Sequence, residues 1–230
     1  NRKNIALILS GGEGKRFDKS KPKQFFKINN QTILEITVEK FIKSSLFNNV
    51  IVVCPLKHKS ETQRLLKKFK VTIVTGGETR QKSVLNGLEK SKKYKSENII
   101  VHDVVRPFFS KKLLNDILEN LKKNKCVIPS LNVYDSVRFY SKDVYKNIER
   151  DNLKLIQTPQ GFKFDTIYNA HKNANKFNFT DDSLLVFNNE KNILLIPGEI
   201  LNFKITEKND LNKSIKLLEG VMNNVNIRTG

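Results

Sequence analysis

The sequence predicts an α/β domain, in which a mostly parallel sheet carries helices on both faces. Short apolar runs alternate with helical patterns through the first half of the chain, which is the rhythm of βαβ units. The first run, residues 5–9, is continuously apolar, as is typical of a strand that is buried on both faces. The 230 residues suffice for one large domain with a substantial core, and we see no linker or repeat among them.

The elements that follow can be assigned in order. The first helix is expected to begin near Thr32, because Thr32 and Glu35 have the spacing of a capping box. The pattern then predicts strands at 50–54, 71–74, 99–102 and 126–129, with helices at 61–69, 83–92 and 111–122 between them. Further along we expect a helix near 165–175, a short apolar segment at 184–187, strands at 193–196 and 202–205, and a last helix at 211–221.

The alternation breaks at residues 132–150, which carry the pattern of a β-hairpin. Aromatic and aliphatic side chains stand on both sides of a polar centre at 141–143. So much aromatic surface is unusual on a monomer, and a protruding β-arm that packs on a second subunit would bury it. A hairpin folded onto its own domain fits the pattern equally well. The domain is expected over 1–222, with 223–230 as a tail or the start of a linker.

The composition limits the kinds of partner that the chain is expected to bind. A net charge of +19 raises nucleic-acid binding as a possible function. However, only eight of the 42 basic residues are Arg, the better reader of bases and phosphates, so we interpret the lysines as solvated helix faces and expect no nucleic acid. No apolar run approaches the roughly 20 residues that span a bilayer, so no membrane role is expected. Cys54 and Cys126 are expected to be buried free thiols in the cytoplasm.

The most informative stretch follows the first strand. It reads S-G-G-E-G-K-R over residues 10–16 and is followed by P-K-Q at 22–24. Glycines permit a tight turn with N–H groups open to an anion, and the cations Arg16 and Lys23 come soon after, a combination that suits a polyphosphate. The spacing fits neither a Walker A loop nor a dinucleotide fingerprint. The pattern therefore indicates a nucleotidyltransferase loop, with a glycine turn that binds nothing as the alternative.

Two further motifs follow predicted strands, at the edge of the sheet where ligands bind in open α/β folds. Gly77, Glu78 and Ser83 offer backbone groups and small polar side chains that could read a base. Asp103 could hold a ribose hydroxyl or a magnesium-bound water, and Arg106 a phosphate. A plain β-to-α turn and an Asp–Arg pair that fixes a loop are the alternatives. His102 is interpreted as a packed strand residue rather than a catalyst.

The carboxy-terminal half adds isolated polar signals. These are Asp135 and Ser136, Arg150, the stretch 157–160, the stretch 180–182, and Lys204. Each alone would be interpreted as a loop or a surface charge. Residues 158–160 are expected to form a turn at a strand exit, and residues 180–182 could be no more than a helix N-cap.

Taken in order, these motifs resemble those of 2-C-methyl-D-erythritol 4-phosphate cytidylyltransferase of the non-mevalonate isoprenoid pathway, from residue 5 to about residue 218. The resemblance implies a Rossmann-like fold, a homodimer joined through the β-arm, and Mg²⁺ or another divalent cation. It also implies the reaction: the substrate phosphate attacks the α-phosphorus of CTP in line, giving 4-diphosphocytidyl-2-C-methyl-D-erythritol and pyrophosphate. Residues 225–230 resemble the start of a cyclodiphosphate synthase domain, as in bifunctional fusions of the two enzymes.

The resemblance also implies roles for individual residues. The CTP triphosphate would be cradled by Ser10, Gly11, Gly12, Gly14, Arg16 and Lys23, and cytosine would be read by Gly77, Glu78 and Ser83. Asp103 and Arg106 would line the ribose and metal region, with Asp103 as the candidate metal ligand, directly or through water. Ser136 and Arg150 of the arm, with Thr180 and Lys204, would bind methylerythritol phosphate across the dimer interface. The expected catalytic cations are Arg16, Lys23 and Lys204, because phosphoryl transfer depends on positioning and charge neutralisation.

Three other functions compete with this one. Ribitol-5-phosphate cytidylyltransferase belongs to the same superfamily and would share the nucleotide half of the site. A nucleic-acid-binding protein is favoured only by the charge. A catalytically inactive nucleotide-binding regulator would bind CTP without releasing pyrophosphate.

Overall fold

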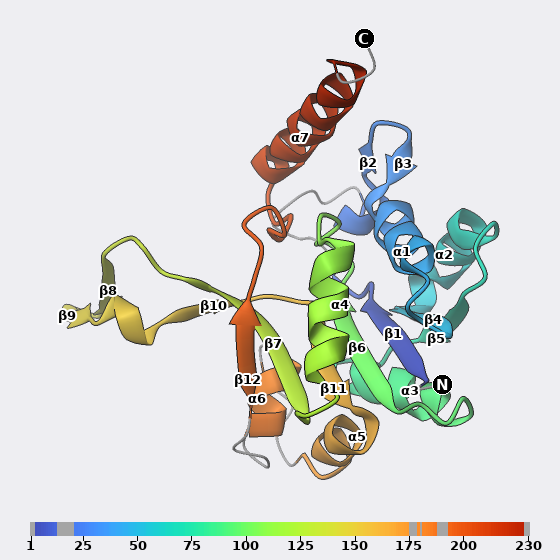
Figure 1. Ribbon diagram of the computed structural model, residues 1–230, viewed down its shortest axis with the longest axis horizontal. Coiled ribbons are helices and arrows are strands. Elements are labelled where there is room, and N and C mark those ends of the chain that lie inside the picture. The colour runs from blue at the N-terminus through green and yellow to red at the C-terminus, as the bar shows by residue number, and fades with distance from the viewer. Residues whose placement is uncertain (1–2, 13–20, 175–178, 180, 188–192, 228–230) are drawn as a thin grey trace.

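The computed structural model describes residues 3–12, 21–174, 179, 181–187 and 193–227 (Figure 1). Its centre is an eight-stranded sheet with β12 (Leu194–Pro197) beside β7. Along the sheet the other strands run in the order β10 (Lys154–Ile156), β7 (Cys126–Asn132), β11 (Gln160–Lys163), β6 (Asn98–Asp103), β1 (Asn4–Leu9), β4 (Asn49–Cys54) and β5 (Thr72–Thr75).

The middle of this sheet is parallel. β1 pairs with β4 on one side and with β6 on the other, and β4 pairs with β5, all in parallel. The carboxyl ends of these four strands therefore meet at one edge, where the loops that follow them come together. The predicted α/β, Rossmann-like architecture is confirmed.

Helices cover both faces of the sheet. One face packs against α1 (Ile33–Ser44), α2 (Lys59–Leu66) and α4 (Lys111–Asn120), and the other against α3 (Arg80–Lys92), α5 (Phe164–Lys172) and α6 (Asp182–Phe187). Along β1, Ala6 and Ile8 join the first core, whereas Ile5 and Leu7 join the second. This alternation explains why the first strand is apolar throughout.

The first helix begins where its capping signal predicts. Thr32 Oγ1 accepts a hydrogen bond from the Glu35 N–H at 3.2 Å, and the Thr32 N–H donates to Glu35 Oε2 at 3.0 Å. The two residues thus satisfy two backbone donors of the first turn, as a capping box should. Thr32 also closes the small hairpin of β2 (Lys27–Ile28) and β3 (Gln31–Thr32).

One predicted strand was wrong. Residues 202–205 were expected to form a strand, but they form a loop held by a hydrogen bond from the Ile205 N–H to the Val105 carbonyl. The turn expected at 158–160 does follow a strand, β10, but Gln160 already begins β11, which the sequence did not predict and which lies antiparallel between β6 and β7. Gly161 makes this insertion possible, because a methyl group on it would lie 2.3 Å from Ile117 Cγ2 of α4.

The predicted arm at 132–150 is a two-stranded hairpin of β8 (Val137–Ser141) and β9 (Val144–Ile148). The two strands pair only with each other in the described sheets, and Figure 1 shows them projecting from one side of the body. Tyr134, Tyr140 and Tyr145 are 77%, 74% and 69% exposed. The protruding hairpin is therefore confirmed, and the alternative of a hairpin packed on its own domain does not hold.

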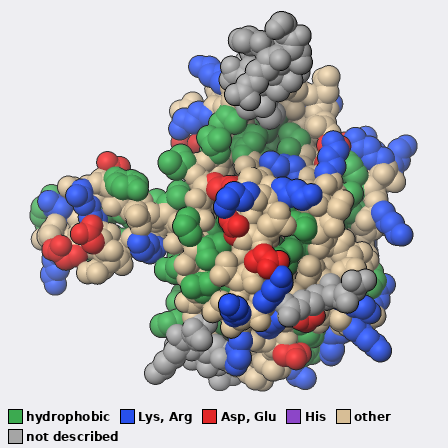
Figure 2. Space-filling model, viewed as in Figure 1, with side chains coloured by type: hydrophobic (Ala, Val, Ile, Leu, Met, Phe, Trp, Pro, Cys, Tyr) green, Lys and Arg blue, Asp and Glu red, His purple; other side chains and the backbone are tan. Residues whose placement is uncertain are grey.

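The last helix, α7 (Lys208–Ile227), runs across position 222, where the sequence suggested a boundary. None of the described helices is long and apolar enough to cross a membrane. On the face drawn in Figure 2, Lys and Arg are scattered over body and arm with Asp and Glu among them.

Candidate active site

A cavity of about 450 Å³ lies at the carboxyl edge of the parallel strands. Its wall contains the ends of β1 and β6 and the residues just after β4 and β5. Eight of the residues predicted for the site line it: Gly11, Gly12, Lys23, Gly77, Glu78, Ser83, Asp103 and Lys204. The fold thus brings together signals that are spread over nearly two hundred residues.

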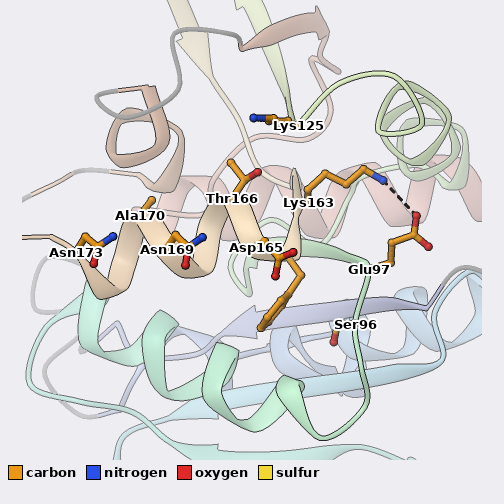
Figure 3. A pocket seen from close by; sticks show the side chains of 10 residues that line it. Ser96, Glu97, Lys125, Lys163, Asp165, Thr166, Asn169, Ala170 and Asn173 are labelled. Atoms are coloured by element: carbon orange, nitrogen blue, oxygen red, sulfur yellow. Dashed lines mark hydrogen bonds and ion pairs between the residues drawn. The ribbon is translucent and has the colours of Figure 1, made fainter.

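A second cavity, of about 620 Å³, lies at the opposite edge of the sheet (Figure 3). Its wall includes Glu97, just before β6, and Lys163 at the end of β11, whose Nζ lies 3.4 Å from Glu97 Oε1. None of the residues predicted for the site lines it. Because α/β folds bind ligands beyond the carboxyl ends of their parallel strands, the smaller cavity is the candidate site.

The first glycine loop leaves β1 directly at this cavity. The Ser10 N–H extends the sheet by donating to the Val53 carbonyl at 2.8 Å, and Gln24 Nε2 donates to the Ser10 carbonyl at 3.1 Å. Gly11 and Gly12 are exposed, and among the described residues a methyl group on either would meet nothing within 4 Å. Contacts with the described residues therefore do not require glycine at these two positions, and the bare backbone there is open to the close approach of a ligand.

The second glycine turn packs tightly on the start of α3. Ser83 Oγ accepts from the Gly77 N–H at 3.1 Å and donates to the Thr79 carbonyl at 2.9 Å. A methyl group on Gly77 would lie 2.4 Å from Lys82 Cβ. Here glycine is required by packing. Glu78 is exposed and pairs with Lys82 at 3.0 Å, so its carboxylate stands at the rim of the cavity.

Charged groups gather around Asp103 at the end of β6. Lys204 Nζ lies 2.8 Å from Asp103 Oδ2, and the nearest Arg80 nitrogen lies 3.9 Å from Asp103 Oδ1. Burial raises the pKa of Asp103, but Lys204 and then Arg80 outweigh it, so the pKa lies below its usual value. Asp103 is thus held ionised beside a cavity with further cations.

Asp103 is suited to share a magnesium ion with phosphates. Mg²⁺ usually keeps several waters and takes one or two carboxylates plus substrate phosphates, so a cage of protein ligands is not needed. Within the described residues no cluster of three or more His, Cys, Asp or Glu could hold a metal. One carboxylate whose Oδ1 has no hydrogen bond from a described side chain fits the shared arrangement.

Arg106 braces a loop. Its NH1 donates to the Asn202 carbonyl at 2.9 Å, and it is not part of the cavity wall. Asn202 in turn donates to the Thr158 carbonyl at 2.8 Å and accepts from Gln157 at its own carbonyl. These bonds position the segment that carries Lys204. The geometry therefore favours a loop-fixing role for Arg106, through the Asn202 carbonyl and not through the Asp–Arg pair that the sequence suggested.

His102 is a packed strand residue, as expected. It is fully buried between Phe41 and Phe109, with Nδ1 3.0 Å from Thr158 Oγ1 and Nε2 2.9 Å from the Arg106 carbonyl. The carbonyl can only accept, so Nε2 carries the proton. Thr158 Oγ1 also accepts from the Asp103 N–H at 3.0 Å. His102 thus supports the backbone at Asp103 without reaching the cavity.

The burial of His102 predicts a loss of stability in mild acid. Burial, the main cause, lowers the pKa of His102 to about 3 from an ordinary 6.5. Below pH 6.5, His102 is protonated in the unfolded chain but stays neutral in the folded chain. The free energy of unfolding therefore decreases as the pH falls toward 3. The histidine contributes about 1.4 kcal/mol of this loss at pH 5.5.

Urea unfolding at pH 7.5 and 5.5 measures the loss. His102→Gln keeps polar groups near both partners but cannot titrate, so its decline over this range is expected to be smaller by that amount. Equal declines in the two proteins would show that His102 is not responsible.

The remaining predicted residues lie elsewhere. Gly14, Arg16 and Thr180 fall outside the described residues. Ser136 and Arg150 lie on the arm, and Arg150 NH1 donates to the Tyr134 carbonyl at 2.6 Å. Neither lines the cavity. Sequence reasoning also missed Arg80 and Thr206, which do line it. Arg80 belongs to the second glycine motif, and this position in the sequence could have indicated that it lies at the site.

Comparison with known proteins identifies the family. A family model described as 2-C-methyl-D-erythritol 4-phosphate cytidylyltransferase matches residues 4–219. The chain is 37% identical over 215 residues to a protein of that name from Thermosipho melanesiensis, and the match covers 90% of this chain and 94% of that protein. The chain belongs to this family.

A solved structure of similar length and a longer relative also match the chain. The crystal structure of 4-diphosphocytidyl-2C-methyl-D-erythritol synthase from Anaerococcus prevotii matches with a TM-score of 0.82 at 29% identity, covering 95% of this chain and 96% of that one. A bifunctional enzyme IspD/IspF from Pelagibacter ubique is 38% identical over 205 residues, covering 89% of this chain. The chain spans 55% of that relative, about half its length.

Proposed function

We propose that this cytidylyltransferase converts CTP and 2-C-methyl-D-erythritol 4-phosphate to 4-diphosphocytidyl-2-C-methyl-D-erythritol and pyrophosphate at the 450 Å³ cavity. The observation that carries the proposal is the meeting of both glycine turns, Asp103 and two lysines in the wall of one cavity. Membership of the family supports the identity of the two substrates. The size of the cavity suits a small ligand, since such pockets usually measure about 300–1,000 Å³.

In the proposed reaction the chain binds and orients two phosphates. An oxygen of the methylerythritol phosphate attacks the α-phosphorus of CTP, a bond forms there, and the bond to the β-phosphate oxygen breaks. A phosphate is already a nucleophile, so no general base is required. The work of the protein is then positioning and neutralisation of charge. Lys23 and Lys204 supply positive charge from two walls of the cavity, and Arg16 is proposed to add a third cation.

Gly11, Gly12 and Gly14 are proposed to bring backbone N–H groups to the triphosphate, together with Ser10. Gly77, Glu78 and Ser83 are proposed to read cytosine from the second glycine turn. A bound Mg²⁺ would neutralise phosphate charge, and Asp103 is the residue proposed to hold it. For Arg106 we propose an indirect role, through the loop that presents Lys204.

Methylerythritol phosphate is proposed to bind between two copies of the chain. Ser136 and Arg150 lie on the arm and Lys204 in the cavity wall, so one chain does not bring all three to one place. An arm that reaches a second copy would bury its exposed tyrosines and complete that copy's site together with Thr180. We therefore propose a homodimer whose arms exchange.

Mixing two inactive variants tests this arrangement. Arg150→Ala disables the arm and Lys204→Met disables the cavity, so each pure variant is expected to be inactive. After unfolding and joint refolding, half of the dimers are mixed, and each mixed dimer has one site built from intact parts. The mixture should therefore regain about a quarter of the wild-type rate. A mixture that stays as inactive as its components would contradict exchange of the arms.

A turnover assay tests the function itself. Purified protein, CTP and Mg²⁺ are combined with 2-C-methyl-D-erythritol 4-phosphate or with ribitol 5-phosphate, and pyrophosphate release is followed. The methylerythritol compound is expected to be the preferred acceptor. Preference for ribitol 5-phosphate would replace the proposed substrate, and CTP binding without pyrophosphate release would indicate an inactive regulator.

Two observations support proposals about the cellular location of the protein and about its domain organisation. Cys54 and Cys126 are buried free thiols, which supports our proposal of a cytoplasmic location. The bifunctional relatives support the proposal that residues 223–230 lead into a cyclodiphosphate synthase domain, with 1–222 as the nucleotidyltransferase domain.

A further inference from the structure

Two buried polar residues lie behind the cavity and have no part in the proposed chemistry. Asp182, the first residue of α6, and His171, near the end of α5, each have a side chain that is 1% exposed. They connect to the cavity through Arg80. The distances are 2.8 Å from His171 Nε2 to Asp182 Oδ1, 2.7 Å from Asp182 Oδ2 to Arg80 NH2, and 3.9 Å from Arg80 NH2 to Asp103 Oδ1.

Each carboxylate oxygen of Asp182 has a partner: Oδ1 is hydrogen-bonded to His171, whereas Oδ2 makes an ion pair with Arg80 and no hydrogen bond. Burial raises the pKa of Asp182, but Arg80 and then His171 outweigh it, so Asp182 is ionised and can only accept. His171 Nε2 is therefore the donor in its bond to Oδ1. A buried carboxylate is costly unless it is paired, and this one pairs with one cation and one ring N–H. The packing of α5 against α6 thus determines where Arg80 is held.

The consequence appears at Asp103. Arg80 NH2 is 2.7 Å from Asp182 but 3.9 Å from Asp103, which is too far for a hydrogen bond. Lys204 donates a hydrogen bond to Asp103 Oδ2, and Asp103 Oδ1 receives no hydrogen bond from the described side chains. Without Asp182, the guanidinium of Arg80 would have Asp103 as its remaining ion-pair partner among the described residues. Arginine and a carboxylate readily form a two-bond pair, and such a pair would occupy Oδ1.

We propose that the Asp182–His171 pair is a positioning unit, which holds Arg80 in the cavity wall and thereby keeps one oxygen of Asp103 available to the bound nucleotide and its cation. This inference rests on the proposed function, because it assumes that CTP occupies the cavity. Asp182 and His171 touch no substrate and act through Arg80 alone.

The test measures CTP affinity by equilibrium dialysis in the presence of Mg²⁺. Asp182→Asn is expected to weaken CTP binding by about tenfold, because Arg80 moves to Asp103. In an Arg80→Met background no guanidinium can move, so the same Asp182→Asn change should alter affinity less than twofold. An equal loss in both backgrounds would mean a merely structural role and would overturn the proposal, as would no loss in the native background.

A second pair of variants covers the case in which Asp182→Asn does not fold. His171→Leu removes the donor to Asp182, whereas His171→Gln keeps an amide N–H near the position of Nε2. Weaker CTP binding is expected for the leucine variant and near-native binding for the glutamine variant. Equal affinities in these two proteins would overturn the proposal. The wild type is measured first: a wild type that binds no CTP refutes the function as well, whereas one that binds normally confines any failure to Asp182 and His171.

Discussion

Lys23→Ala is expected to lower kcat by about 10²–10³-fold while leaving the fold intact. Lys23 stands in the cavity wall on the turn that follows the first glycine loop. As the α-phosphorus becomes five-coordinate, a cation already in position stabilises the developing charge without reorganisation, and losing one such group costs about 3–4 kcal/mol. Steady-state kinetics with both substrates saturating isolates this effect from weaker binding.

Lys27→Ala is the matched control, since Lys27 is exposed on β2 and does not line the cavity. It should retain near-native kcat. A Lys23→Ala enzyme that works at the speed of this control would remove Lys23 from the proposed chemistry. Circular dichroism of both variants establishes that the fold is unchanged.

Lys204→Met is expected to lower kcat/KM by about 10²–10³-fold as well, for two joined reasons. The change removes a cation from the cavity wall, and it removes the partner that lies 2.8 Å from Asp103 Oδ2. Asp103 then remains beside the cavity with Arg80, at 3.9 Å, as its ion-pair partner among the described residues. Methionine keeps the length of the side chain, so the loss reports the charge.

Lys213→Met provides the comparison for this position. Lys213 lies on α7, is largely exposed, and sits 4.0 Å from Asp210, so its removal should change kcat/KM less than twofold. If Lys204→Met lost no more than a few-fold, the proposal that Lys204 neutralises phosphate charge would be wrong.

The local parts of this fold were predictable because they depend on nearby residues. The continuous apolar run at 5–9 predicted a strand buried on both faces, and the spacing of Thr32 and Glu35 predicted the start of α1. The parallel arrangement followed from the alternation of strands and helices. Because the carboxyl ends of parallel strands share an edge, the two glycine turns and Asp103 could be expected at one place.

The sequence-based predictions of secondary structure failed where a segment's conformation depends on the segments packed against it. Residues 202–205 have the pattern of a strand but find their hydrogen bonds in loops. The short β11 forms because it pairs with both β6 and β7. Four residues are too few to show a periodic pattern that would predict this strand. A short segment has little propensity of its own, so its neighbours determine its conformation.

The sequence by itself therefore determined the fold class, the family and eight of the residues in the cavity wall, since these follow from periodicity and from motifs of adjacent residues. Tertiary structure alone decided how the charges are paired. Lys204 pairs with Asp103, which lies 101 positions away in the chain. Arg80 pairs with Asp182, for which the local sequence suggested no more than a helix N-cap. Such pairings depend on how helices and strands pack over long separations, and side-chain spacing along the chain does not encode them.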